Sequence, residues 1–290
     1  MKEEDNNNKV SGNNKKEVGY TSVLDFGREA KVEFPHNIGE YPTKILPQVI
    51  ELMVLRFSEE KDTILDPFCG SGTVAVEAKK HGRNSINYDI VPLAVELTRE
   101  KLSLTNPLKD YLTPTNHIVE IQDARNLPLE DESVDAIITD IPYFSMIKYS
   151  DLPDDLSNIE DYQQFLEEIT KAFSEMYRVL KKGKYCVIFV ADYRVAASRT
   201  IYPLHADVIN IMRELGFVLF DIYIWRYYRS GEFRPFGKRP FQAMNLHTYI
   251  LVFYKPKDDE KFDKRNKPIR YRKRLIEKLE KTRKIISESQ

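Results

Sequence analysis

The chain has 290 residues, of which 42% are hydrophobic, a size that allows one full core. No apolar run approaches the roughly 20 residues that a membrane span requires, and the polar start of the chain resembles no signal peptide. Cys69 and Cys186 are too few for a disulfide framework or a zinc site, so we expect a cytoplasmic protein.

The charge is unevenly distributed, although the net charge is only -1. From Lys264 to Lys284 there are eleven Lys or Arg and two Glu, a local balance of +9 (11 - 2), which leaves -10 (-1 - 9) for the rest. Such a tail is typical of contact with a polyanion, or of a solvated helix that aids solubility. We therefore divide the chain into a disordered segment (1–18), a globular domain (19–255) and a basic helical tail (256–290).

Strands and helices alternate along the globular domain, which is typical of a parallel sheet with helices on both faces. The last two strands are joined by a loop and should pair antiparallel. No element is predicted for 20–34. The expected elements are a helix from 47 to 57, a strand at 63–66, a helix at 74–80, a strand at 85–90, a helix at 93–102, strands at 117–121 and 134–139, a helix after 157, a strand at 185–191, a helix at 204–216, and strands at 218–227 and 246–254.

The helix after residue 157 has the strongest pattern. Ser157 and Glu160 are spaced as a capping box, and Gly183 is placed to end the helix. Between them, apolar residues recur at helical spacing, which predicts one face packed against the sheet.

Residues 66–73 read Asp-Pro-Phe-Cys-Gly-Ser-Gly-Thr and join a strand to a helix. Gly70 and Gly72 allow a tight turn, and the N–H groups of the following helix point at whatever binds there. Asp89 closes the next strand, where a carboxylate is placed to bond ribose hydroxyls. A plain glycine turn and a turn-capping aspartate are the alternatives.

Asp140-Ile141-Pro142-Tyr143 follows the strand at 134–139. Open α/β sheets place their ligands at this carboxyl end of a central strand. A strand-end turn is the structural alternative.

The two motifs together resemble S-adenosylmethionine-dependent DNA amino-methyltransferases, which methylate N4 of cytosine or N6 of adenine. The loop meets every fixed position of the family pattern Asp-Pro-Phe-x-Gly-x-Gly-Thr. The order of the motifs resembles the family's gamma arrangement, in which the target-recognition segment follows the catalytic motif. The tetrapeptide is similar to (Asp/Asn/Ser)-Pro-Pro-(Tyr/Phe/Trp), with Ile141 in place of the first proline, a change that related RNA methyltransferases tolerate. The resemblance covers about 36–255.

The resemblance implies a class I methyltransferase fold, with seven mostly parallel strands and an antiparallel last strand. It also implies S-adenosylmethionine as the cofactor, whose sulfonium methyl requires no metal. By resemblance, Asp123 bonds the adenine amino group, although a turn-forming aspartate is the alternative. The expected cofactor-binding residues are Thr43, Asp66, Pro67, Phe68, Gly70, Gly72, Thr73, Asp89, Ile90, Asp123 and Ala124.

The resemblance also assigns the chemistry to the tetrapeptide. Asp140 and the carbonyl of Ile141 would accept the two hydrogens of an exocyclic amino group, which turns its lone pair towards the methyl. Pro142 stiffens that carbonyl, and Tyr143 offers an aromatic face to a flipped base. Positioning then provides most of the catalysis of an in-line transfer.

The loop at 229–241 interleaves basic and Phe side chains, which suits phosphate contact and base stacking. An ordinary solvated loop is the alternative. The candidate nucleic-acid-binding residues are Arg229, Arg234, Phe236, Lys238 and Arg239.

These observations favour a DNA methyltransferase, with N4 of cytosine expected ahead of N6 of adenine and a restriction enzyme as a candidate counterpart. An rRNA or tRNA methyltransferase with the same mechanism is the main alternative. A non-catalytic nucleic-acid binder, a Rossmann dehydrogenase and a protein methyltransferase are weaker ones. No membrane partner is expected, and the oligomeric state is left open.

Overall fold

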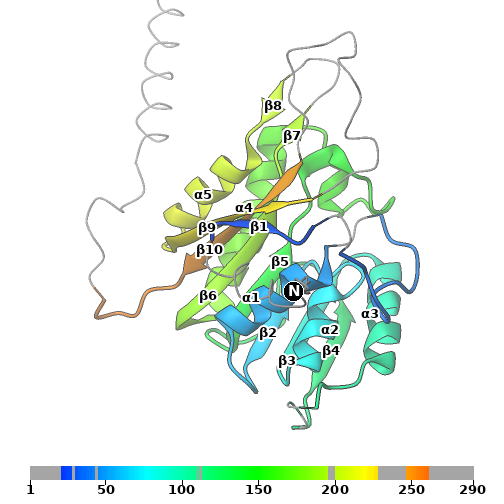
Figure 1. Ribbon diagram of the computed structural model, residues 1–290. Coiled ribbons are helices and arrows are strands. Elements are labelled where there is room, and N and C mark those ends of the chain that lie inside the picture. The colour runs from blue at the N-terminus through cyan, green and yellow to red at the C-terminus, as the bar shows by residue number, and fades with distance from the viewer. Residues whose placement is uncertain are drawn as a thin grey trace, which may run out of the picture.

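The computed structural model describes residues 21–27, 30–42, 45–109, 111, 113–194, 200–227 and 246–260. One sheet runs through the molecule, and helices cover both of its faces (Figure 1). Its strands are β1 (Val23–Asp25), β2 (Thr63–Asp66), β3 (Asn84–Asp89), β4 (His117–Ile121), β5 (Val134–Asp140), β6 (Leu180–Val190), β9 (Val218–Arg226) and β10 (His247–Tyr254), in the spatial order β1-β9-β10-β6-β5-β2-β3-β4.

The helices divide between two hydrophobic layers. One layer holds α1 (Pro47–Phe57), α2 (Thr73–Lys80) and α3 (Pro92–Leu104), and the other holds α4 (Tyr162–Val179) and α5 (Leu204–Glu214). Because both faces are covered, the central strands are apolar along most of their length, as β5 shows. The mixed α/β fold is the one expected.

The pairing of the strands places their ends. β2 runs parallel to β3 and β5, and β5 runs parallel to β6. β10 is antiparallel to both β6 and β9, which confirms the expected antiparallel pair at the end of the domain. Parallel strands bring Asp66, Asp89 and Asp140 to one carboxyl edge, because each is the last residue of its strand.

The main sheet has eight strands, and seven were expected. The additional strand is β1, which pairs with β9 in parallel at the sheet edge. It has only three residues, too few for an alternating pattern, and the pairing with β9 rather than the local sequence defines it. A separate ribbon of β7 (Tyr193–Arg194) and β8 (Ile201–Tyr202) was also not predicted.

The predicted capping box at Ser157 and Glu160 is wrong. α4 begins later, and its cap is Asp161, which accepts a hydrogen bond from the Gln164 N–H at 2.7 Å. Ser157 belongs to a short 3-10 helix, η2 (Leu156–Asn158). The helix also ends before Gly183, because β6 begins at Leu180. Pairing with β5 holds that residue in a strand, so tertiary contact overrides the helical pattern.

Candidate functional site

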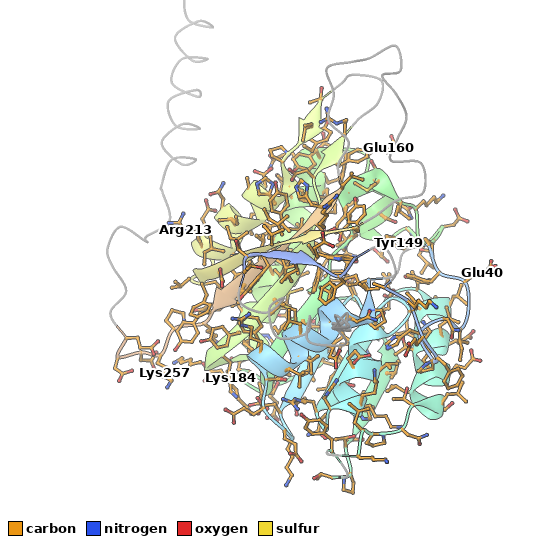
Figure 2. The ribbon with its side chains drawn as sticks, in the orientation of Figure 1. Glu40, Tyr149, Glu160, Lys184, Arg213 and Lys257 are labelled. Carbon is orange, nitrogen blue, oxygen red and sulfur yellow. The ribbon has the colours of Figure 1, made fainter. Side chains whose placement is uncertain are left out.

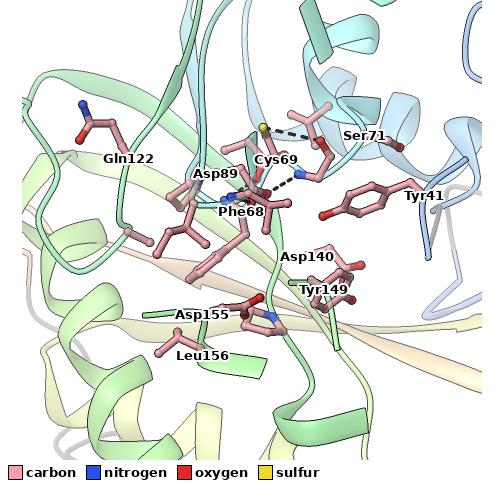
Figure 3. Close-up of a pocket in the computed structure, with 18 of the residues that line it drawn as sticks. Tyr41, Phe68, Cys69, Ser71, Asp89, Gln122, Asp140, Tyr149, Asp155 and Leu156 are labelled. Atoms are coloured by element: carbon pink, nitrogen blue, oxygen red, sulfur yellow. Dashed lines mark hydrogen bonds between the residues drawn. The ribbon is translucent and has the colours of Figure 1, made fainter. Parts of the chain in front are cut away.

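A pocket lies at the carboxyl edge, between the loop after β2, the ends of β3 and β5, and the segment after β4. Gln122 lies towards one end and Tyr41 and Tyr149 towards the other (Figure 3). Most of the residues singled out from the sequence meet here. Those that line the pocket are Asp66, Pro67, Phe68, Gly70, Thr73, Asp89, Ile90, Asp123, Ala124, Asp140 and Pro142.

The glycine loop adopts a backbone that other residues disfavour. Gly70 has a φ of 49° and Gly72, which caps α2, a φ of 80°. A Cβ at Gly70 would lie 3.1 Å from the Tyr41 ring, and one at Gly72 would lie 2.6 Å from the Thr98 hydroxyl. Both glycines are therefore needed, one beside the pocket and one beneath the loop.

Asp89 joins β3 to the glycine loop. Its Oδ2 accepts a hydrogen bond from the Gly70 N–H at 2.8 Å, and its Oδ1 accepts one from the Val91 N–H at 2.9 Å. Burial raises the pKa of Asp89 to about 6, and these backbone donors oppose that rise. A carboxylate has about four acceptor sites, so Asp89 can hold the loop and still accept from a ligand hydroxyl.

Asp66 lies deeper, between β2 and β5. It accepts hydrogen bonds from the Thr139 hydroxyl at 2.7 Å and from the Phe68 N–H at 3.3 Å. Burial raises its pKa to about 8. The bond to Thr139 joins the strand before the glycine loop to the strand that carries Asp140.

Asp140 accepts a hydrogen bond from the Tyr143 hydroxyl, three residues further along the chain. Removal from solvent raises the pKa of Asp140 to about 7, while the tyrosine bond lowers it. Ile141 stands where the family pattern has proline. Its side chain is only 1% exposed and belongs to the core, and its N–H donates to Phe189 of β6 at 3.4 Å. The family departure therefore adds core packing at the base of the tetrapeptide.

Asp123 is paired within the chain. Arg125 donates from Nε to both carboxylate oxygens at 3.0 Å and from an outer nitrogen to Oδ2 at 2.6 Å. The same guanidinium reaches Glu168 of α4 at 2.8 Å. Partial burial raises the pKa of Asp123, but the bonds from Arg125 outweigh it and hold the pKa below its ordinary value. Ala124, beside it, lines the pocket directly.

Much of the pocket wall opposite the glycine loop was not predicted from the sequence. Tyr41 was not among the predicted site residues, yet its ring stacks on Tyr149 with centroids 5.9 Å apart. Tyr149 lines the pocket, and Figure 2 shows it between the labelled Glu160 above and Glu40 below. It follows the tetrapeptide in an irregular segment, so no periodic signal marks it. The other unpredicted lining residues include Gln122, Asp154, Asp155 and Leu156.

Several predicted positions lie outside the described residues. These are Thr43, the segments 1–18 and 261–290, and the candidate nucleic-acid contacts Arg229, Arg234, Phe236, Lys238 and Arg239. The ends of that last segment are nonetheless placed. Arg226 at the end of β9 is the register partner of His247 at the start of β10, so the intervening chain leaves and re-enters the sheet at its carboxyl edge.

Two kinds of feature are absent from the described ranges. These ranges contain no group of three or more His, Cys, Asp or Glu side chains arranged to hold a metal ion. No helix within them has both the length and the apolar character needed to cross a membrane.

Comparison with models of protein families assigns this chain to a family. A model of the N6/N4 family, described as DNA methylase, matches residues 1–100 and 134–288. The chain belongs to this DNA methylase family. A second model, the RMKL-like methyltransferase domain, matches residues 52–203.

The curated relatives include a tRNA methyltransferase and type II methyltransferases by name. The chain is 41% identical over 104 residues to a tRNA (guanine(10)-N2)-dimethyltransferase of Methanothermobacter thermautotrophicus, covering 36% of this chain and 29% of that one. It is 34% identical over 157 residues to the type II methyltransferase M.MjaII of Methanocaldococcus jannaschii, covering 52% and 29%. The chain thus spans under a third of the length of these two relatives.

Solved structures support the fold. An S-adenosylmethionine-dependent methyltransferase from Methanosarcina mazei superposes with a TM-score of 0.50 at 14% identity, over 71% of this chain and 98% of that one. The [4+2]-cyclase SpnF also reaches 0.50, at 16% identity, over 73% and 82%. At such identities the likeness concerns the fold alone, which is the class I methyltransferase fold.

S-adenosylmethionine is the cofactor of this family, and the pocket of the chain fits it. The glycine loop offers a backbone cradle, since a side chain at Gly70 would meet Tyr41 across it. The side chains of Asp66, Asp89 and Asp140 line the same cavity, and their oxygens offer acceptors for the ammonium and the ribose hydroxyls of such a ligand.

Proposed function

We propose that the methylase transfers a methyl group from S-adenosylmethionine to the exocyclic amino group of a base in DNA. N4 of cytosine is the favoured target, ahead of N6 of adenine. The observation that carries the proposal is the position of Asp140, which ends β5 and lines the cofactor pocket, with the Tyr143 hydroxyl bonded to its carboxylate. An acceptor for an amino hydrogen thereby lies beside the methyl donor's site.

The geometry supports a division of work within the tetrapeptide. Asp140 accepts one hydrogen of the amino group, and the carbonyl of Ile141 accepts the other. When bound, the cofactor supplies an electrophilic methyl on its sulfonium. Asp89 and the glycine loop would hold the cofactor, and the amino nitrogen oriented by Asp140 and the Ile141 carbonyl would receive its methyl group. Asp140 takes the proton that the nitrogen then loses, a role that its pKa of about 7 allows near neutral pH.

Substrate binding is proposed for the same edge of the sheet. The segment between Arg226 and His247 begins and ends at the edge that carries Asp140. It contains the basic and Phe residues singled out from the sequence, which suit contact with phosphates and stacking with bases. This arrangement would place a nucleic acid over the tetrapeptide, with one base flipped towards Asp140.

RNA is the second candidate substrate, and two findings favour it. The RMKL-like model matches residues 52–203, and a relative of 41% identity is named a tRNA (guanine(10)-N2)-dimethyltransferase. An exocyclic amino group is the acceptor in that name too, so the proposed chemistry is unchanged. Only the partner and the manner of its recognition differ.

The experiment supplies tritium-labelled S-adenosylmethionine to the purified protein with unmethylated genomic DNA and with ribosomal and transfer RNA in parallel. Asp140→Ala serves as the matched inactive variant. Label in DNA that depends on Asp140 supports the proposal, and label in RNA alone replaces it with the second candidate. Label in neither, from protein that binds the cofactor, contradicts both.

A further inference from the structure

A lysine buried completely beneath the glycine loop has no place in the proposed chemistry. Lys101 of α3 has a relative exposure of 0%, and its Nζ donates to the Ser71 carbonyl at 2.8 Å. Lysine is almost never fully buried unless it is paired, because removing the ammonium from water is costly. One group that Lys101 contacts, the Ser71 carbonyl, belongs to the glycine loop. This contact points to a role for the lysine in the loop.

Thr98 lies one turn earlier on the same face of α3. Its hydroxyl donates to the Gly70 carbonyl at 3.1 Å, and its side chain occupies the space beneath Gly72. Residues three apart on a helix are neighbours, so Thr98 and Lys101 form one polar surface under the loop. Neither residue lines the pocket.

Three successive peptide units of the loop are therefore held by side chains. Asp89 accepts from the N–H of Gly70, Thr98 donates to the carbonyl of Gly70, and Lys101 donates to the carbonyl of Ser71. In a planar trans peptide the carbonyl and the following N–H point in opposite directions. Drawing the Gly70 carbonyl towards α3 thus turns the Ser71 N–H away from α3.

We infer that Lys101 and Thr98 are positioning residues for the cofactor. They fix the carbonyls of the loop from beneath, and the loop backbone keeps the shape that the cofactor contacts. Lys101 should make the larger contribution, because a hydrogen bond from a charged donor is stronger than one from a neutral hydroxyl. This inference rests on the proposed use of the pocket for S-adenosylmethionine.

The test compares Lys101→Met with Lys79→Met. Lys79 also donates to a backbone carbonyl of α3, that of Leu102 at 2.9 Å, but it lies away from the pocket. Both variants lose a lysine-to-carbonyl bond and both should lower the melting temperature. Calorimetric titration with S-adenosylmethionine should show Kd raised about tenfold or more in Lys101→Met and within twofold of wild type in Lys79→Met. An equal Kd in the two variants would overturn the inference.

A second pair of variants keeps the test decisive if Lys101→Met does not fold. Thr98→Val preserves shape and removes the hydroxyl, whereas Thr98→Ser keeps it. We expect Kd to rise a few-fold in Thr98→Val and to return towards wild type in Thr98→Ser, and no difference between them would count against the inference. If the wild-type protein itself does not bind S-adenosylmethionine, the assignment of the pocket is at fault rather than the role of Lys101.

Discussion

Two aspartates at the same edge of the sheet are held in different ways. Asp89, at the end of β3, accepts hydrogen bonds from two backbone N–H groups. Asp140, at the end of β5, accepts a hydrogen bond from a side chain instead, the hydroxyl of Tyr143. The first is bonded to the backbone of the glycine loop, and the second is bonded within the tetrapeptide that it begins. Position at the edge alone therefore does not define a residue's role.

The same contrast separates two halves of this sheet edge, one around β2 and β3 and the other around β5, β6 and β10. Around β2 and β3, the side chains of Thr98, Lys101 and Asp89 fix the loop backbone. Around β5, β6 and β10, the edge carries the tetrapeptide and the ends of the segment proposed to bind nucleic acid. Variants in the first half should change cofactor affinity, and variants in the second should change turnover.

The largest effect is expected from Asp140→Ala. The change removes the proposed acceptor of the amino hydrogen, so kcat should fall by roughly 10²–10⁴. The Kd for S-adenosylmethionine, measured by calorimetric titration, should stay within a few-fold of wild type. Loss of cofactor binding in this variant would contradict the division between the two halves.

The next largest effect is expected from Gly72→Ala. A φ of 80° costs a residue with a Cβ about 1–2 kcal/mol, and the new atom would press on Thr98. We take these two costs together as about 3 kcal/mol. If they destabilise only the loop conformation that binds the cofactor, Kd should rise by about 100-fold. Gly82→Ala is the control, since Gly82 has a φ of 72° but lies outside the pocket. It should lose stability and keep its cofactor affinity.

Asp89→Asn and Asp123→Asn compare two carboxylates that share the pocket lining. Asp89→Asn places an amide that can donate where both oxygens accept, and we expect Kd to rise about tenfold, because a hydrogen bond to a charged group contributes about 1.5–3 kcal/mol. Asp123→Asn should have a smaller effect, since Arg125 already engages both of its oxygens. The reverse order, measured by the same titration, would show that Arg125 releases Asp123 when the cofactor binds.

The smallest effect is a shift in pH dependence. Asp140 can take up the proton of the amino group only as the carboxylate, so kcat/KM should rise with pH through about 7, the pKa of the free enzyme's group. The Tyr143 hydroxyl lowers that pKa, so Tyr143→Phe should move the midpoint to higher pH while a plateau of activity persists. A midpoint that stays in place would mean that another group controls the profile.

The positions of the glycine loop and Asp89 at one edge of the sheet could be predicted from the sequence, because their constraints are local. Gly70, Gly72 and Asp89 follow strands at fixed short spacings, and each is placed by its own strand and turn. The stacking of Tyr149 on Tyr41 and the bond from Arg125 to Glu168 depend on how distant segments pack, and short-range patterns do not record such contacts. The role of Lys101 was also hidden, because a lysine in a helix is normally expected on the solvated face.

The same distinction applies to the fold. The helices and the long strands have periodic patterns, and the structure places them near the expected residues. β1 and the limits of α4 are set by contacts that no periodic pattern records. The pairing with β9 defines β1, the Asp161 side chain caps the start of α4, and the pairing of β6 with β5 ends the helix. Tertiary pairing therefore accounts for β1 and for the end of α4, and a local cap accounts for its start.

The most direct test of the account identifies the atom that receives the methyl group. Nucleic acid methylated in vitro with ¹³C-methyl-labelled S-adenosylmethionine would be digested to nucleosides and compared with standards by mass spectrometry. The account predicts label on an exocyclic amino nitrogen, with N4-methylcytosine ahead of N6-methyladenine in DNA. Label on a ring carbon or a ring nitrogen would contradict it, because Asp140 and the Ile141 carbonyl would then have no amino hydrogens to accept.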